Sequence, residues 1–125
     1  MTKLFRYLLA STFFISATVN AEVATVCDAG CDHNTIKDAD FATSLGAIIQ
    51  VKTAKTYNEH DLTLSGKTLI SDGGPAAYII NGSGCMNNVV STGAGGSIEG
   101  FTITGCQKTG TSNNGAGLVS NGNTN

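Results

Sequence analysis

Residues 62–71 read LTLSGKTLIS, and this stretch decides the fold. An apolar residue, a spacer, a second apolar residue and a small polar residue lead to Gly66, after which the chain enters another apolar strand. The same glycine-ended phrase returns at 78–82 (YIING) and at 101–105 (FTITG). Self-similarity at a period of about 20 residues indicates a solenoid, in which each repeat stacks on the one before it. We therefore predict stacked β-strands.

The repeats can be aligned as two columns of strands. The glycines that end the phrases form one column, and the apolar residues that follow the turns form the other. The apolar column is Ile49, Leu69, Val89 and Leu118, and the glycine column is Gly66, Gly82 and Gly105. A solenoid tolerates turns of different length, because insertions leave the stack without disturbing it. We predict parallel pairing, with a short strand at 97–99 completing a coil. An antiparallel meander is the alternative, because Asn81-Gly82 is typical of hairpin turns.

A short helix is predicted within residues 32–46, before the first coil. Its apolar residues recur every third position, and they are Ile36, Ala39, Ala42 and Leu45. Asp32 or Asn34 is expected to cap its start, and Gly46 to end it.

Residues 1–21 have the pattern of an export signal. Lys3 and Arg6 precede an apolar run, and Ala21 completes a small-x-small site for cleavage. The run is shorter than the roughly 20 residues of a membrane-spanning helix, so we predict no transmembrane segment after cleavage. We expect the mature chain to be extracellular or on the cell surface, with the periplasm as the alternative.

The charge of the chain argues against nucleic acid as a partner. Its 125 residues carry seven Lys and Arg against nine Asp and Glu, a formal net charge of −2. No basic stripe or basic-aromatic cluster is present in the sequence, and such features mark nucleic-acid-binding surfaces.

Four cysteines in an exported chain predict two disulfides, because the compartment is oxidising. We favour Cys27–Cys31, which closes a small loop, and Cys85–Cys106. The second pair follows the glycines of successive phrases, and stacking would bring those positions together. The alternative is a zinc site made of Cys27, Cys31, His33 and a fourth ligand that the sequence does not show.

The strand pattern resembles the start of a right-handed parallel β-helix of the pectin-lyase-like superfamily. The residues that carry the likeness are 49–51 (IQV), 56–59 (TYNE), 80–84 (INGSG) and 98–105 (IEGFTITG). The likeness extends over residues 35–122. This part of the chain is similar to the first coils of exported bacterial surface proteins. It implies an all-β fold with an N-terminal helix over the open end, and an internal polar ladder that includes Asn87 and Asn88.

The signal pattern, the predicted helix and the resemblance together give a domain organisation. Residues 1–21 are the signal peptide, 22–46 the N-terminal segment with the capping helix, and 47–125 the coils. Members of the superfamily run through many coils and this chain has about three. We therefore expect it to be an amino-terminal part of a longer β-helix, incomplete at its C-terminus.

Two functions follow from the resemblance. One is a binding or adhesion module for carbohydrate or a surface partner. The other is the first part of a polysaccharide lyase or glycoside hydrolase whose catalytic coils lie downstream. A lyase needs a cation and a base, and a hydrolase needs two facing carboxylates. From the second coil onward only Glu99 and Lys108 could serve, on different turns. We predict no catalytic residues and no cofactor here, and we favour the binding module.

Residues 57–61 contain the candidate ligand contacts. Glu59, His60 and Asp61 cluster in one turn, which is either simply solvated or a site for an ion or a sugar. Tyr57 either stacks on a sugar ring or packs over the coil. Further along, Asp72 opens a glycine-rich turn; we expect its side chain to cap that turn, with calcium binding as the alternative.

Overall fold

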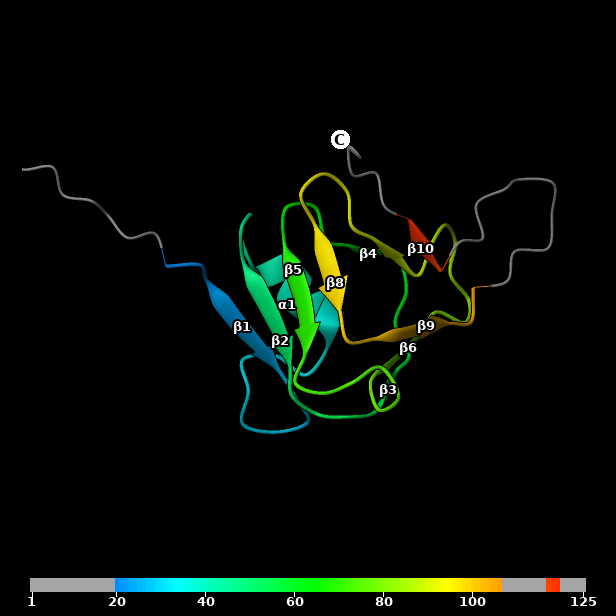
Figure 1. Ribbon diagram of the computed structural model, residues 1–125, viewed down its shortest axis with the longest axis horizontal. Coiled ribbons are helices and arrows are strands. Elements are labelled where there is room, and N and C mark those ends of the chain that lie inside the picture. The colour runs from blue at the N-terminus through cyan, green and yellow to red at the C-terminus, as the bar shows by residue number, and fades with distance from the viewer. Residues whose placement is uncertain (1–19, 107–116, 120–125) are drawn as a thin grey trace, which may run out of the picture.

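The chain forms a parallel β-solenoid of three coils, which a computed structural model describes over residues 20–106 and 117–119 (Figure 1). The first coil contains β2 (Ile48–Val51), β3 (Thr56–Tyr57) and β4 (Leu62–Thr63). The second contains β5 (Thr68–Ser71), β6 (Ile79–Asn81) and β7 (Val90–Ser91). The third contains β8 (Ser97–Glu99), β9 (Thr102–Thr104) and β10 (Leu118–Val119). The predicted stack of β-strands is confirmed. Residues 1–19 of the predicted signal peptide lie outside the described chain.

Equivalent strands of successive coils form three parallel sheets. Sheet A has the order β1-β2-β5-β8, sheet B the order β3-β6-β9, and sheet C the order β10-β7-β4. The strand β1 (Val23–Val26) belongs to the N-terminal segment and adds to sheet A ahead of the first coil. Every pair of strands in the described chain is parallel. This excludes the antiparallel meander for these strands.

The predicted apolar column combines strands from two sheets. Ile49 stacks on Leu69 as predicted, but the next residue in that column is Ile98 of β8, not Val89. Val89 leads into β7, which lies in sheet C together with β10. The prediction was wrong because loops of different length separate the strands, so a constant step of about 20 residues does not identify one sheet.

The predicted glycine column holds for two of its three members. Gly82 lies beside the end of β9, and its N–H donates to Thr104 O at 2.8 Å. Gly66 instead follows sheet C, and its N–H donates to Ala94 O at 2.9 Å. The three phrases look alike because each is a buried strand that runs into a tight turn. They do not occupy equivalent places in the coil.

One of these turns requires glycine for two reasons. Gly105 has φ +90°, which L side chains rarely adopt, and a Cβ there would collide with the Asn81 side-chain oxygen. That amide belongs to a short ladder on the outside of sheet B, in which Asn81 Nδ2 donates to Asn58 Oδ1 at 3.1 Å. The expected ladder of Asn87 and Asn88 inside the solenoid is wrong, because Asn87 is exposed and Asn88 half-buried.

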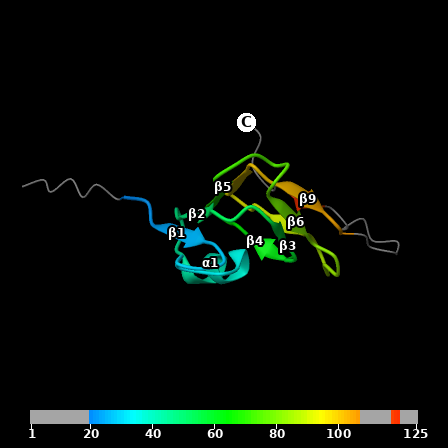
Figure 2. The same cartoon turned by 90° about the horizontal axis from the view of Figure 1, so that it is seen from below.

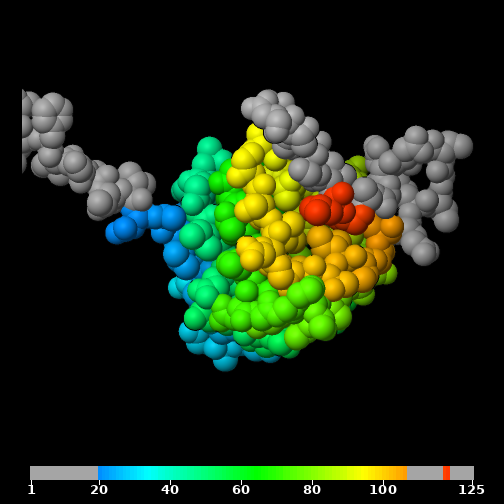
Figure 3. Space-filling view, viewed as in Figure 1, coloured from blue at the N-terminus to red at the C-terminus, as the bar shows by residue number. Residues whose placement is uncertain are grey.

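The helix α1 (Ile36–Ala42) packs against β1, β2 and β4 and lies beneath the first coil, as predicted. Figure 2 shows it at the opposite end of the stack from β9. Figure 3, in the view of Figure 1, shows the third coil (yellow to red) on the face toward the viewer. The helix is shorter than the predicted span 32–46 and stops before Gly46.

Both ends of α1 differ from the prediction. Thr35, rather than Asp32 or Asn34, is the N-cap, and its hydroxyl accepts a hydrogen bond from Asp38 N at 3.0 Å. The residue after the helix, Thr43, has extended backbone with ψ 151°, which stops the helical hydrogen-bond pattern.

The buried face of the helix is also partly unexpected. Ile36 and Ala39 are fully buried, as the apolar spacing predicted. Ala42 is exposed and Leu45 is 80% exposed, so the predicted stripe does not continue. Asp40 is buried in their place. Its carboxylate finds a partner in the first coil, which no spacing rule on the helix alone could show.

Inward-pointing residues of the three sheets form a single core. They alternate with outward residues along each strand, since successive side chains point to opposite faces. The largest fully buried side chains are Val26, Ile36, Ile49, Val51, Leu62, Leu64, Leu69, Ile80, Val89 and Val90. Burying one such aliphatic side chain contributes about 1.5–3 kcal/mol. In the third coil the equivalent residues Ile98 and Ile103 are only half-buried.

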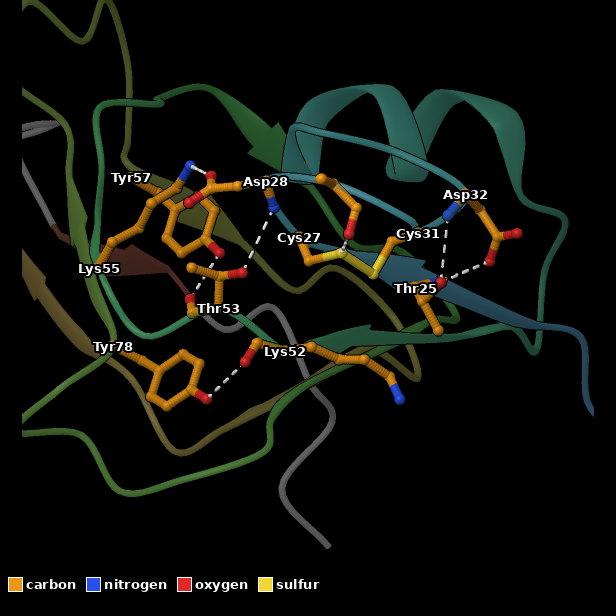
Figure 4. Close-up of a disulfide and its surroundings, with 11 residues drawn as sticks. Thr25, Cys27, Asp28, Cys31, Asp32, Lys52, Thr53, Lys55, Tyr57 and Tyr78 are labelled. Carbon is orange, nitrogen blue, oxygen red and sulfur yellow. Dashed lines mark hydrogen bonds and ion pairs between the residues drawn. A yellow bond between two sulfur atoms is a disulfide. The ribbon is translucent and has the colours of Figure 1, made fainter.

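Both predicted disulfides are present. Cys27–Cys31 closes the loop after β1 (Figure 4), with a Cα–Cα distance of 5.6 Å. Cys85–Cys106 joins the loop after β6 to the end of β9, with a Cα–Cα distance of 5.7 Å. It therefore links the second coil to the third. The zinc alternative is wrong, because the thiols it required are bonded to each other.

Candidate functional site

The turn that joins β3 to β4, residues 59–61, lies between two polar hollows. The first, which we call the inter-coil hollow, has a volume of about 300 Å³ and lies between the first and second coils on sheet C. The second, the helix hollow, has a volume of about 340 Å³ and lies where the turn meets α1. The inter-coil hollow is lined by Asp61, Leu62, Thr63, Asn87, Asn88 and Ser91. The helix hollow is lined by Thr35, Lys37, Asp38, Asn58, Glu59 and His60.

Glu59 holds the start of the capping helix. Its two carboxylate oxygens accept hydrogen bonds from the backbone N–H groups of Ile36, at 3.0 Å, and Lys37, at 2.8 Å. The first N–H groups of a helix have no partner within the helix, and a negative charge there also interacts favourably with the helix dipole. Glu59 therefore fastens α1 to the first coil, and both its oxygens are used in doing so.

Asp61 joins the first coil to the second. Its carboxylate accepts hydrogen bonds from Asn87 N at 3.1 Å and Met86 N at 3.4 Å, and its own N–H donates to Asn88 O at 2.9 Å. It is the non-glycine residue with positive φ (+54°) in the described chain. Such strained residues gather at ligand sites more often than elsewhere. Asp61 thus fixes the wall of the inter-coil hollow.

His60 holds the carboxylate of Asp61 in place. Its Nδ1 lies 2.6 Å from Asp61 Oδ2, in a hydrogen bond in which the ring N–H donates. This bond, together with the backbone N–H groups of Asn87 and Met86, lowers the pKa of Asp61 from its ordinary value, while partial desolvation opposes the shift. Asp61 therefore stays ionised through the physiological pH range.

Tyr57 belongs to the core. Its side chain is 3% exposed, and its hydroxyl donates to Thr53 O at 2.7 Å (Figure 4). Desolvation, with the nearby charge of Asp28, raises the pKa of Tyr57 to about 12. Lys55 Nζ lies 4.9 Å from the centre of the ring. The ring face that a sugar would need is therefore covered, and the packing alternative describes this residue.

Asp72 makes a contact between coils. Its carboxylate accepts a hydrogen bond from Gln50 Nε2 of the preceding coil. Across residues 20–106 and 117–119, no three His, Cys, Asp or Glu side chains lie close enough together to hold a metal ion. Within the described chain, Asp72 therefore links two successive coils through its hydrogen bond with Gln50.

The carboxylate of Asp32 holds the loop closed by Cys27–Cys31 (Figure 4). Asp32 Oδ2 accepts hydrogen bonds from Thr25 N at 2.9 Å and Thr25 Oγ1 at 2.8 Å. The bond from the Thr25 backbone N–H contributes most to lowering the pKa of Asp32, and the bond from the Thr25 hydroxyl acts in the same direction. Asp28 forms an ion pair with Lys55 across the same loop. These contacts anchor the loop to β1 and to the first coil.

The inter-coil hollow contains polar side chains that are not used within the described chain. The side-chain amides of Asn87 and Asn88 and the hydroxyls of Thr63 and Ser91 make no hydrogen bond to another described residue. Thr63 and Ser91 are register partners on β4 and β7, so their side chains lie on the same face of sheet C. The hollow could not be predicted from the sequence, because its walls come from two separate segments, and only the structure shows that β4 pairs with β7.

No part of the described chain forms a helix long and apolar enough to cross a membrane. The fold and site define a β-solenoid with a helical cap and a polar hollow between its first two coils. Comparison with protein-family models, with curated proteins and with solved structures finds no match to this chain.

Proposed function

We propose that this chain is part of an exported or cell-surface β-solenoid, of the right-handed pectin-lyase-like type, that binds carbohydrate. The observation that carries the proposal is the inter-coil hollow, with four polar side chains free of partners in the described chain. Carbohydrate sites are built from such amides and hydroxyls, because each can both donate to and accept from a sugar hydroxyl.

The rigidity of the hollow supports a binding role. Its wall at 86–88 is fixed by Asp61 on one side and by the Cys85–Cys106 disulfide on the other. A site whose groups are held before the ligand arrives loses less conformational freedom on binding. Export is supported by the two disulfides, which persist in oxidising compartments.

The carboxylates of the turn are poorly placed for hydrolysis or lyase chemistry. Glu59 accepts two helix N–H groups, and Asp61 accepts two backbone N–H groups and the His60 ring N–H. A general acid or base must be free to exchange a proton with the substrate. The geometry of this turn therefore favours binding over catalysis.

A polysaccharide binding screen tests this function. The oxidised protein is passed over immobilised plant, bacterial and animal polysaccharides, and retention is compared with that of the same protein reduced and unfolded. We expect saturable retention of the folded form on at least one polysaccharide. Retention on none, or equal retention of the unfolded form, would overturn the proposal.

A further inference from the structure

We propose that the inter-coil hollow selects uncharged sugars over uronic acids or sulfated sugars, an inference that rests on the proposed carbohydrate-binding function. The selection comes from which groups line the hollow and which do not. The polar groups that have no hydrogen-bond partner among the described residues are two amides and two hydroxyls, all neutral, from Asn87, Asn88, Thr63 and Ser91.

The one charge at the hollow has the wrong sign for an acidic sugar. Among the described residues that line it, Asp61 alone is charged, and neither Lys nor Arg is among them. Its carboxylate is ionised because His60 and two backbone N–H groups hold its pKa low. Sites that bind carboxylates and sulfates use Arg or Lys, and a like charge at the site repels them.

The neighbouring helix hollow differs in this respect. Lys37, Asp38, Glu59 and His60 line it, so charges of both signs are present. Glu59 is occupied by the N-terminus of α1. The two hollows therefore present different chemistry on either side of one turn: among the described lining residues, the helix hollow has a lysine and the inter-coil hollow has no Lys or Arg.

The spacing of the hydroxyls suits a single sugar ring. Thr63 and Ser91 face outward on adjacent parallel strands, which lie about 4.8 Å apart. The volume of about 300 Å³ is at the lower end of the range for small-molecule sites. Leu62, beneath these groups, is 1% exposed and so offers little apolar surface. Affinity must then come from hydrogen bonds, and we expect a Kd on the order of 1 mM for one ring.

Nuclear magnetic resonance titration of the oxidised full chain tests the selection. The probes are maltohexaose, cellohexaose and xylohexaose as neutral ligands and hexagalacturonate as the acidic one. We expect at least one neutral probe to bind at least about tenfold more tightly than hexagalacturonate, with shifts at Asn87 and Asn88.

Two matched threonine variants locate the binding. Thr63→Val removes a hydroxyl from the hollow, and Thr56→Val removes one from the outer face of sheet B, where Thr56 is likewise exposed on a strand. One lost hydrogen bond of average strength weakens binding about fivefold, which we expect for Thr63→Val and not for Thr56→Val. Asn88→Ala is expected to act in the same direction as Thr63→Val.

The outcomes separate the two proposals. If no carbohydrate binds in this titration or in the wider screen, the proposed function fails. If hexagalacturonate binds as tightly as the neutral probes, or if Thr63→Val and Asn88→Ala leave binding unchanged, the inference about the hollow is overturned. In either of these last two cases carbohydrate binding itself would stand.

Discussion

Lys67 Nζ lies 2.8 Å from Asp40 Oδ1 and joins the turn after β4 to the capping helix. Both side chains are about one-tenth exposed, at 12% and 10%. Lys67 Nζ also donates to the backbone carbonyl of Asp40, and Asp40 Oδ2 accepts a weaker bond from Thr63 N at 3.4 Å. A charge pair so far from water holds the helix on the first coil, and each charge depends on the other.

Replacing Lys67 by methionine is expected to lower the free energy of unfolding by about 3 kcal/mol, because Asp40 is left as a buried charge without its partner. Urea unfolding followed by circular dichroism measures the change. Lys52→Met is the matched control, since Lys52 is exposed and its ammonium makes no ion pair with another described residue. A loss no larger than that of the control would contradict the role of the pair.

Removing both charges should be less harmful than removing one. In Asp40→Leu combined with Lys67→Met, no buried charge remains, so we expect most of the stability lost in Lys67→Met to return. If Asp40→Leu lowers the free energy of unfolding of the Lys67→Met variant as much as it lowers that of the unmodified protein, the two residues are not coupled.

Glu59 is expected to stabilise α1 from outside the helix. Glu59→Ala leaves the N–H groups of Ile36 and Lys37 without this acceptor, and should cost about 0.5–2 kcal/mol, the range for loss of a helix N-cap. Asp38→Ala, in the first turn of the same helix, is the control, because the Asp38 carboxylate is exposed. Equal losses in the two variants would mean that only the helix dipole is involved.

The two disulfides should contribute unequally to stability. Loop-closure entropy gives about 3 kcal/mol for a loop of the size closed by Cys85–Cys106 and about 2 kcal/mol for that of Cys27–Cys31. The sequence separations are 21 and 4 residues. Urea unfolding of Cys85→Ser with Cys106→Ser, compared with Cys27→Ser with Cys31→Ser, measures the difference. A larger loss in the second pair would contradict the ranking.

Acid is expected to weaken the folded state through Asp32 and Asp61. Both carboxyls have a pKa in the folded protein below their ordinary value of 3.8. Each therefore adds stability above about pH 4, and that stability is lost as the pH falls through the lowered folded pKa. Unfolding measured between pH 6 and pH 2.5 should show a slope that is smaller in Asp61→Asn and in Asp32→Asn. An unchanged slope in both variants would contradict this prediction.

Strands and disulfides were largely predictable from the sequence. The glycine-ended phrases predicted buried strands that run into turns, because alternation and glycine act over a few residues. Cys85 and Cys106 follow Gly82 and Gly105, which are in fact stacked, so the pairing was predicted correctly. The third coil completes each of the three sheets, as the solenoid prediction required.

The register and the candidate site were less predictable. Leu62 pairs with Val90, and Ile49 aligns through Leu69 with Ile98; loops of unequal length hide both relationships. The cluster at 59–61 was recognised, but the backbone N–H groups that bind the carboxylates of Glu59 and Asp61 lie more than twenty residues away. Their roles depend on distant backbone groups.

The sequence by itself determined that this chain is a stack of short strands with an N-terminal helix and two disulfides. These features follow from local patterns in the sequence and from the number and spacing of its cysteines. Only the tertiary structure decided which strands share a sheet, that Asp40 pairs with Lys67, and that Thr63 and Ser91 meet at one hollow. Those relationships arise when loops of unequal length bring separate coils together. They therefore depend on the free energy of packing between residues far apart in the sequence, which local sequence patterns do not describe.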